Sequence, residues 1–175
     1  MRSEGQQGKE NKDWNNFGKP SAAFMKECIQ PLPEVEACTA FSTADVALVS
    51  LTDGNNRLKV DAMSTDPDFW KIFKLQFLDG KSFTEAELGG DMQSVVISAS
   101  VARKLFGTTE AAGRQMLLNR EVVRIIGVVK DVSVTAKDAY AQVWSMYHSN
   151  ELNVTGWWSY NGNRTIAVLA RTPDD

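Results

Sequence analysis

Few side chains in this sequence have the types and spacing needed for acid–base or nucleophilic chemistry. The single histidine, His148, lies among aromatic residues, and no serine–histidine–aspartate pattern accompanies it. A carboxylate pair could support glycoside hydrolysis. However, Asp66 and Asp68 are better explained as helix-capping charges. Glu85 and Glu87 are better explained as a solvated face. The pattern argues against an enzyme and predicts no catalytic residue.

Phosphate and metal sites are not predicted either. Gly89-Gly90 lacks the lysine and spacing of a phosphate-binding loop. Cys28 and Cys38 lie ten residues apart, and two thiols alone do not complete a zinc site. They can form a disulfide in an oxidising compartment or act as two small buried hydrophobic residues, and the second interpretation is favoured. We therefore expect neither a cofactor nor a metal ion.

The aromatic cluster Trp157, Trp158 and Tyr160 is the best candidate for a binding function. Tryptophan and tyrosine are enriched at protein interfaces, where one end of the side chain can stay in contact with water. The alternative is that alternate members of the cluster fill the core and the others lie under the N-terminal arm. The hypothesis drawn from the cluster is a partner contact.

Composition bounds the class of protein. The chain has 175 residues, a net charge of −3, 43% hydrophobic and 23% charged residues, which is typical of a globular protein with one domain or two small lobes. No basic run indicates a nucleic-acid partner, and no apolar run is long enough to span a bilayer. Residues 1–18 are polar and are expected to form a flexible arm, which leaves residues 19–175 as the folded domain.

The longest apolar, β-branched run covers residues 122–132 and predicts a central strand. Because the run shows little alternation, we expect both faces of the strand to be covered. Gly127 lies in its middle, where a glycine marks a bulge, a bend or a close backbone contact. We expect the strand to bend there and to leave the core at Lys130-Asp131.

Helix-capping and turn residues predict where the other helices and strands begin and end. Ser21 is expected to cap a helix whose apolar face is Phe24, Met25, Cys28, Ile29 and Leu32. Asp66 is expected to cap a second helix, with Pro67 at the first helical position. Ser98 is expected to cap a third helix, which ends at Gly107. Strands are expected at 34–43, 46–52, 57–63, 74–78, 94–97, 114–118, 121–129, 141–147, 157–160 and 165–170, with tight turns at 53–56, 119–120 and 161–162.

Three blocks in series resemble the MacB/FtsX-like ABC transporter permeases. The first is Asp66-Pro67-Asp68-Phe69-Trp70 followed by Phe77-Leu78-Asp79-Gly80-Lys81-Ser82-Phe83. The second is Val95-Val96-Ile97-Ser98 followed by Lys104-Leu105-Phe106-Gly107 and Gly113, and the third is residues 125–132. Order and spacing agree from about Pro20 to Arg171. The chain departs from the pattern at Ala111-Ala112, where the family often has a proline, and at Asp175, beyond which the family's domain often continues. The core domain is therefore expected to be a C-terminally shortened variant or an excised fragment.

The resemblance implies an α+β fold with two lobes, a mixed sheet with short helices and a mostly β lobe inserted between N- and C-terminal segments. It implies a non-catalytic domain on the periplasmic side of the cell inner membrane, tethered by membrane spans in the parent protein. A cytoplasmic ATP-binding subunit or domain would supply the movement. The partners implied are a periplasmic adaptor protein, a lipoprotein or a cell-wall hydrolase, in efflux or lipoprotein-type export.

Two other functions stay open at the level of sequence. A stand-alone soluble peptide- or ligand-binding module would need one concave apolar pocket with a few polar groups. A small hydrolase would need paired acids with shifted pKa values. A flat surface edged by aromatic residues would instead favour the permease domain.

Overall fold

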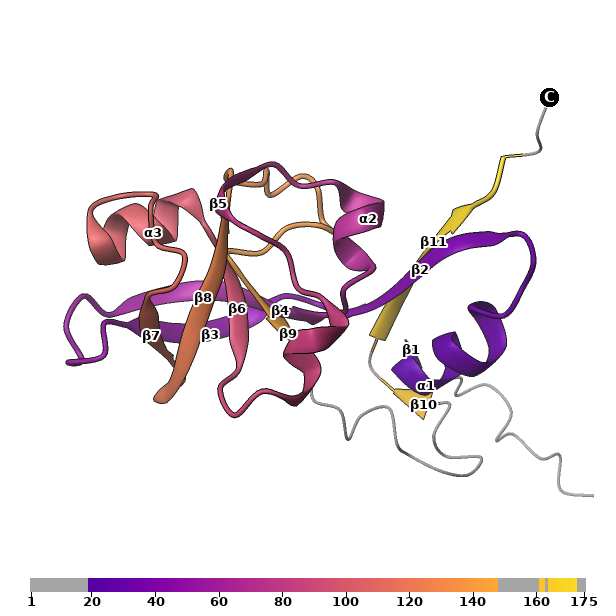
Figure 1. Cartoon of the computed structure of the whole chain (residues 1–175), viewed down its shortest axis with the longest axis horizontal. Helices are drawn as coiled ribbons and strands as arrows, with labels where there is room; N and C mark the ends of the chain where they lie inside the picture. Colours follow the sequence, from indigo (N-terminus) through magenta and orange to yellow (C-terminus); the bar gives the residue numbers. More distant parts are fainter. Residues whose placement is uncertain (1–18, 148–160, 163, 173–175) are drawn as a thin grey trace, which may run out of the picture.

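The structure, a computed structural model, describes residues 19–147, 161–162 and 164–172, and these form two lobes (Figure 1). Segments from both ends of the chain build the first lobe, here called the terminal lobe. Its elements are β1 (Lys19–Pro20), α1 (Ala22–Phe24), η2 (Met25–Ile29), β2 (Val35–Ser42), β10 (Asn161–Gly162) and β11 (Arg164–Ala170). β1 pairs with β10 and β2 pairs with β11, both antiparallel. Early and late parts of the sequence are therefore hydrogen-bonded side by side.

Everything between β2 and β10 that the structure describes belongs to the second lobe, here called the inserted lobe. Its strands are β3 (Asp45–Ser50), β4 (Leu58–Thr65), β5 (Phe77–Gly80), β6 (Ser94–Ser98), β7 (Gln115–Leu118), β8 (Glu121–Val129) and β9 (Val143–Met146). Its helices are α2 (Phe69–Phe73), η3 (Glu85–Gly89) and α3 (Ala99–Phe106). This arrangement confirms the expected α+β fold with a mostly β inserted lobe.

The seven strands of the inserted lobe form one mixed sheet that closes on itself. Their order is β5-β8-β6-β9-β4-β3-β7, and β7 also pairs with β8, so six strands make a ring and β5 lies outside it. β4–β9 and β6–β8 are parallel, and the remaining pairs are antiparallel. Closure removes most of the sheet edges that an open sheet would expose.

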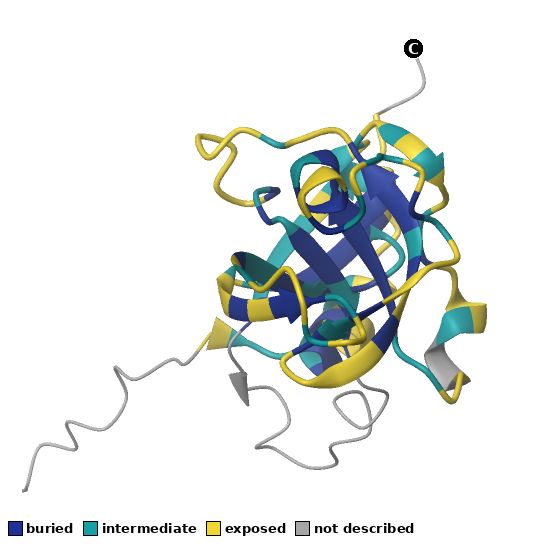
Figure 2. Cartoon of the chain, turned by 90° about the vertical axis from the view of Figure 1, so that its left-hand side faces the viewer, coloured by how far each residue is buried: buried dark blue, intermediate teal, exposed yellow. Residues whose placement is uncertain are grey.

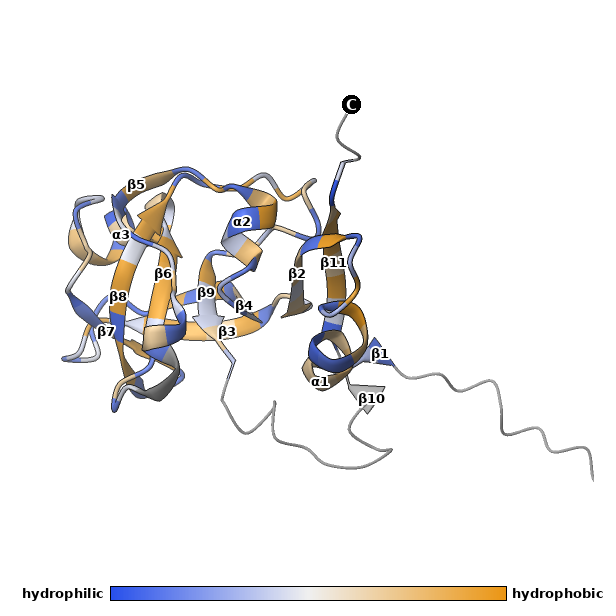
Figure 3. Cartoon of the chain, turned by 45° about the vertical axis from the view of Figure 1, so that its right-hand side comes forward, coloured by the Kyte–Doolittle hydropathy of each residue, from blue (hydrophilic) through white to orange (hydrophobic). Residues whose placement is uncertain are grey.

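The cores follow from this closure. Each ring strand contributes to a single buried cluster that fills the ring and includes one face of α3; its members include Val49, Val60, Ile97, Met116, Ile125 and Val143. A second cluster lies between the outer face of the sheet and α2, and a third lies under α1 and η2. Figure 2 shows the buried strands within a rim of exposed loops, and Figure 3 shows hydrophobic residues along β6 and β8.

The predicted central strand is confirmed as β8, which pairs with β5, β6 and β7. The predicted bend is also present, because the register with β6 shifts between Ile125 and Gly127. A Cβ atom at Gly127 would lie 2.4 Å from the carbonyl oxygen of Lys81 and 2.7 Å from the ring of Phe77. Full burial is confirmed only for the second half of the strand. Val122 is 45% exposed, because the first half belongs to the β7–β8 hairpin and has one face open to solvent.

Local capping and turn chemistry agrees with the prediction at several places. The hydroxyl of Ser98 accepts a hydrogen bond from the backbone N–H of Val101, and Gly107 ends α3 at φ +75°. At the start of η3, however, Glu87 does not lie on the solvated face expected for it, because its side chain is 15% exposed and forms a capping box with Thr84. Asn119 and Arg120 both take positive φ, as the tight β7–β8 turn requires.

Two local predictions in the terminal lobe are wrong. The first helix begins at its predicted cap, since Ser21 accepts from the N–H of Phe24, but it continues as a π-helical turn. That turn changes the angular spacing, so Cys28 and Leu32 are exposed rather than part of the apolar face. The second error concerns Asn161-Gly162, which pairs with β1 as strand β10 instead of forming a hairpin turn.

Both thiols are free in this structure. Cys38 is buried on β2, whereas Cys28 is exposed on η2, so the interpretation of two buried hydrophobic residues holds for Cys38 and is wrong for Cys28. In the part of the chain that the structure describes, no helix has the length and apolar character needed to cross a membrane.

Candidate functional site

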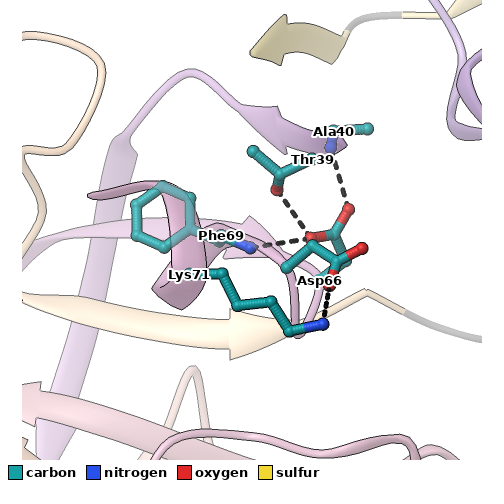
Figure 4. A network of polar contacts seen from close by, with 6 residues as sticks. Thr39, Ala40, Asp66, Phe69 and Lys71 are labelled. Atoms are coloured by element: carbon teal, nitrogen blue, oxygen red, sulfur yellow. Dashed lines mark hydrogen bonds and ion pairs between the residues drawn. The ribbon is translucent and has the colours of Figure 1, made fainter. Parts of the chain in front are cut away.

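The candidate site is the junction between the two lobes, and Asp66 lies at its centre. Asp66 directly follows β4, and only 5% of it is exposed. Its Oδ1 accepts hydrogen bonds from the hydroxyl of Thr39 at 2.6 Å and from the N–H of Phe69 at 3.1 Å. Its Oδ2 accepts from the N–H of Ala40 at 2.8 Å. Figure 4 shows this carboxylate between β2 of the terminal lobe and α2 of the inserted lobe.

A fourth donor comes from the end of β9. The hydroxyl of Tyr147 lies 3.4 Å from Oδ2 of Asp66 and donates to it. Each carboxylate oxygen thus holds one backbone N–H and one hydroxyl group. A buried carboxylate needs such partners, because an uncompensated charge in the interior is strongly unfavourable.

The electrostatics of the junction follow from its burial. Burial raises the pKa of the Asp66 carboxyl above its ordinary value, while the hydrogen bonds from Thr39, Ala40 and Phe69 act in the opposite direction. Burial also raises the pKa of the Tyr147 hydroxyl, and the nearby Asp66 charge adds to that rise. Tyr147 therefore stays a neutral hydrogen-bond donor.

Arg164, the first residue of β11, makes a second polar link between the lobes. Its Nη1 donates to the hydroxyl of Ser64 on β4 at 2.5 Å, and its guanidinium carbon lies 5.1 Å from the centre of the Tyr147 ring. A cation at this distance from an aromatic face is attracted to it. The hydroxyl of Ser42, at the end of β2, also accepts from the N–H of Ser64 at 2.9 Å.

Aromatic rings support the polar links. Phe41 of β2 packs edge-on against Phe69 and Phe73 of α2, with ring centres 5.7 and 5.6 Å apart. Phe69 in turn packs against Trp70 at 5.4 Å. Such edge-to-face pairs contribute about 0.5–1.5 kcal/mol each beyond the area they bury. The junction is therefore a packed interface.

A groove opens beside the junction. It has a volume of about 290 Å³, with Lys26 and Gln30 on the terminal lobe and Asp68 and Glu85 on the inserted lobe. Among the described residues, no group of three or more histidine, cysteine or acidic side chains is placed to hold a metal ion. What the arrangement can do is fasten two lobes together beside an open groove.

The sequence-based site predictions have different outcomes. Trp157, Trp158 and Tyr160 lie outside the described residues, as does His148, so their roles stay predictions. Asp66 was expected only as a helix cap. It does accept from Phe69, and the carboxylate also bonds to β2. However, α2 begins at Phe69 with Asp68 as its N-cap, so the predicted place of Pro67 at the first helical position is wrong. Nothing in the local sequence pointed to that second role; only the burial of an acid after a strand could have suggested it.

Comparison with known proteins identifies this arrangement. The family model described as "MacB-like periplasmic core domain" matches residues 3–175. The chain belongs to this family. It is therefore a periplasmic core domain of the MacB-like ABC transporter permeases.

Relatives of this MacB-like domain carry the name macrolide export ATP-binding/permease protein MacB. The protein from Wolinella succinogenes is 26% identical over 149 residues, which is 84% of this chain and 23% of that protein. The protein from Neisseria gonorrhoeae is 27% identical over 120 residues, or 68% of this chain and 18% of that protein. The chain thus spans about a quarter or less of the length of the curated relatives it matches.

Solved structures show the same fold. The periplasmic region of MacB from Actinobacillus actinomycetemcomitans aligns with a TM-score of 0.68 at 18% identity, covering 91% of this chain and 69% of that one. A domain of a putative permease protein from Porphyromonas gingivalis aligns with a TM-score of 0.65 at 20% identity, covering 91% and 64%. These matches confirm the two-lobed MacB-like architecture.

Proposed function

We propose that this MacB-like domain is a non-catalytic lever of an ABC transporter permease. It transmits a conformational change, driven by cytoplasmic ATP hydrolysis, to a periplasmic partner or substrate in efflux or lipoprotein-type export. The family membership and the macrolide export names of the relatives support the transport role. In this proposal residues 19–175 form the core domain and residues 1–18 its N-terminal arm.

The observation that carries the lever hypothesis is the Asp66 junction. A lever must pass force between two bodies, and a two-state element must have differential contacts that a partner can bias. Asp66 joins β2 of the terminal lobe to α2 of the inserted lobe through bonds at 2.8 and 3.1 Å. A displacement of either lobe therefore acts on the other at this carboxylate.

The partners proposed are an ATP-binding subunit or domain on the cytoplasmic side and a periplasmic adaptor protein or lipoprotein. Trp157, Trp158 and Tyr160 are the proposed contact with the periplasmic partner. The parent protein would be anchored in the inner membrane.

The experiment uses the parent transporter in proteoliposomes with its ATP-binding partner. Asp66→Asn is expected to leave basal ATP hydrolysis in place and to lower the amount of substrate moved per ATP, because the junction transmits the movement. Asp53→Asn is the matched control, since Asp53 lies on the exposed β3–β4 turn away from the junction. Equal transport per ATP in both variants, with both proteins folded, would contradict the lever. A parent gene without membrane spans flanking this stretch would favour a stand-alone binding module instead.

A further inference from the structure

The groove beside the junction has walls that belong to different lobes. Lys26 and Gln30 line it from the terminal lobe, and Asp68 and Glu85 line it from the inserted lobe. Buried Tyr147 and Met146 lie at its floor, next to Asp66. A second hollow of about 440 Å³ has Pro67, Asp68 and Glu85 in common with it as lining residues. A gap with one wall on each lobe changes its width whenever the lobes move.

The two walls of the groove carry opposite charges. Within the described residues the ion pairs are Lys71–Asp68 at 2.6 Å and Lys81–Glu87 at 3.4 Å. Asp68 therefore already has a cation. Lys26 and Glu85 are both exposed and neither belongs to an ion pair there, although the charge of Lys71 also acts on Glu85 from the same wall. An ammonium group on one wall and a carboxylate on the other attract each other across the gap.

We propose that the groove closes and that an ion pair between Lys26 and Glu85 holds the closed position. This inference rests on the proposed lever function and supplies the second of its two positions. Asp66 is the pivot, because its hydrogen bonds from Ala40 and Phe69 lie at the floor and hold the lobes together while the rim moves.

The Lys26–Glu85 ion pair, here called the latch, would be weak enough to form and break reversibly. Ion pairs between exposed side chains contribute about 0.2–1 kcal/mol, which corresponds to about a 1.4- to 5-fold change in the ratio of closed to open molecules. A bias of this size lets a partner shift the populations in either direction. Because the pair is exposed, salt weakens it.

The experiment measures groove width in the full 175-residue chain. Spin labels are attached through Gln30→Cys on the terminal lobe and Ser82→Cys on the inserted lobe, in a Cys28→Ser background. Cys38 is 1% exposed and stays unlabelled. Pulsed electron resonance then gives the distribution of distances between the labels.

The expected result is a short-distance component that Lys26→Glu reduces about 1.4- to 5-fold relative to the long component. The charge swap Lys26→Glu with Glu85→Lys is expected to restore it, and 1 M salt to reduce it in the unmodified pair. Lys59→Glu makes the same charge change on an exposed position of β4 and is expected to leave the distribution unchanged.

A single distance distribution shared by all these variants would overturn the latch, and so would a charge swap that fails to restore the short component. Because the measurement needs neither nucleotide nor transport, its failure is distinguishable from failure of the lever itself. A lever without this latch would still show the transport defect of Asp66→Asn.

Discussion

Asp66→Asn tests the energetics of the junction directly. The substitution keeps the shape of the side chain but replaces one accepting oxygen by an NH₂ group. Each oxygen of Asp66 holds one backbone N–H, that of Phe69 on Oδ1 and that of Ala40 on Oδ2. Whichever way the amide turns, one of these N–H groups faces another donor and stays buried without an acceptor. The hydroxyls of Thr39 and Tyr147 can rotate to accept, so they add little to the cost.

One buried N–H group without an acceptor lowers the free energy of unfolding by about 1–3 kcal/mol. For a chain of this size, that lowers the melting temperature by about 2–12 °C. Urea unfolding followed by tryptophan fluorescence is a suitable assay, since Trp70 and Trp144 are buried in the described core. Asp53→Asn is the matched control on the exposed turn, and its effect is expected to stay within about 0.5 kcal/mol. An Asp66→Asn stability equal to that of the control would refute the reasoning.

The same variant has a defined pH dependence. Burial raises the pKa of Asp66 in the folded state. A raised folded pKa stabilises the fold at pH values below the unfolded pKa, and that stabilisation is lost as pH rises through the folded pKa. Asparagine does not titrate. The stability deficit of Asp66→Asn is therefore expected to grow as pH falls from about 7 to about 4. A deficit that shrinks over this range would contradict the raised pKa.

Three further predictions address other parts of the chain. Gly127→Ala is expected to destabilise the fold by about 1–3 kcal/mol, as calorimetry would measure, because the added Cβ would lie 2.4 Å from a backbone oxygen. Gly90→Ala is the control and is expected to be nearly neutral, because its Cβ would lie 3.6 Å from the nearest atom. Glu87→Ala is expected to destabilise by about 1 kcal/mol at neutral pH through loss of the capping box, as chemical denaturation would measure. Glu87 is partly buried, which raises its pKa, but hydrogen bonds and a nearby cation lower the pKa overall, so this loss should fade as pH falls through that value. Replacing Trp157 and Trp158 by alanine is expected to weaken binding of a purified periplasmic partner about 30-fold in titration calorimetry, with the circular dichroism unchanged; equal affinity would remove the proposed contact.

Features that depend on a few neighbouring residues could be predicted from the sequence. The caps at Ser21 and Ser98 and the positive-φ turn at Asn119-Arg120 are properties of local backbone chemistry. The bend at Gly127 could be predicted for the same reason, since a glycine inside a β-branched run marks a place where a side chain does not fit. The two-lobed fold followed from the order and spacing of the family motifs.

Features that depend on residues far apart in the chain were decided only by tertiary structure. Thr39 is 27 residues from Asp66, and Tyr147 is 81 residues from it, so no local pattern shows that they share one carboxylate. Closure of the ring by the β7–β8 pairing and the pairing of β10 with β1 are likewise long-range contacts. The exposure of Cys28 follows from a π-helical turn that the spacing of apolar residues does not reveal. Local sequence sets which backbone conformations are favourable, whereas the assembled lobes determine which buried groups must satisfy one another.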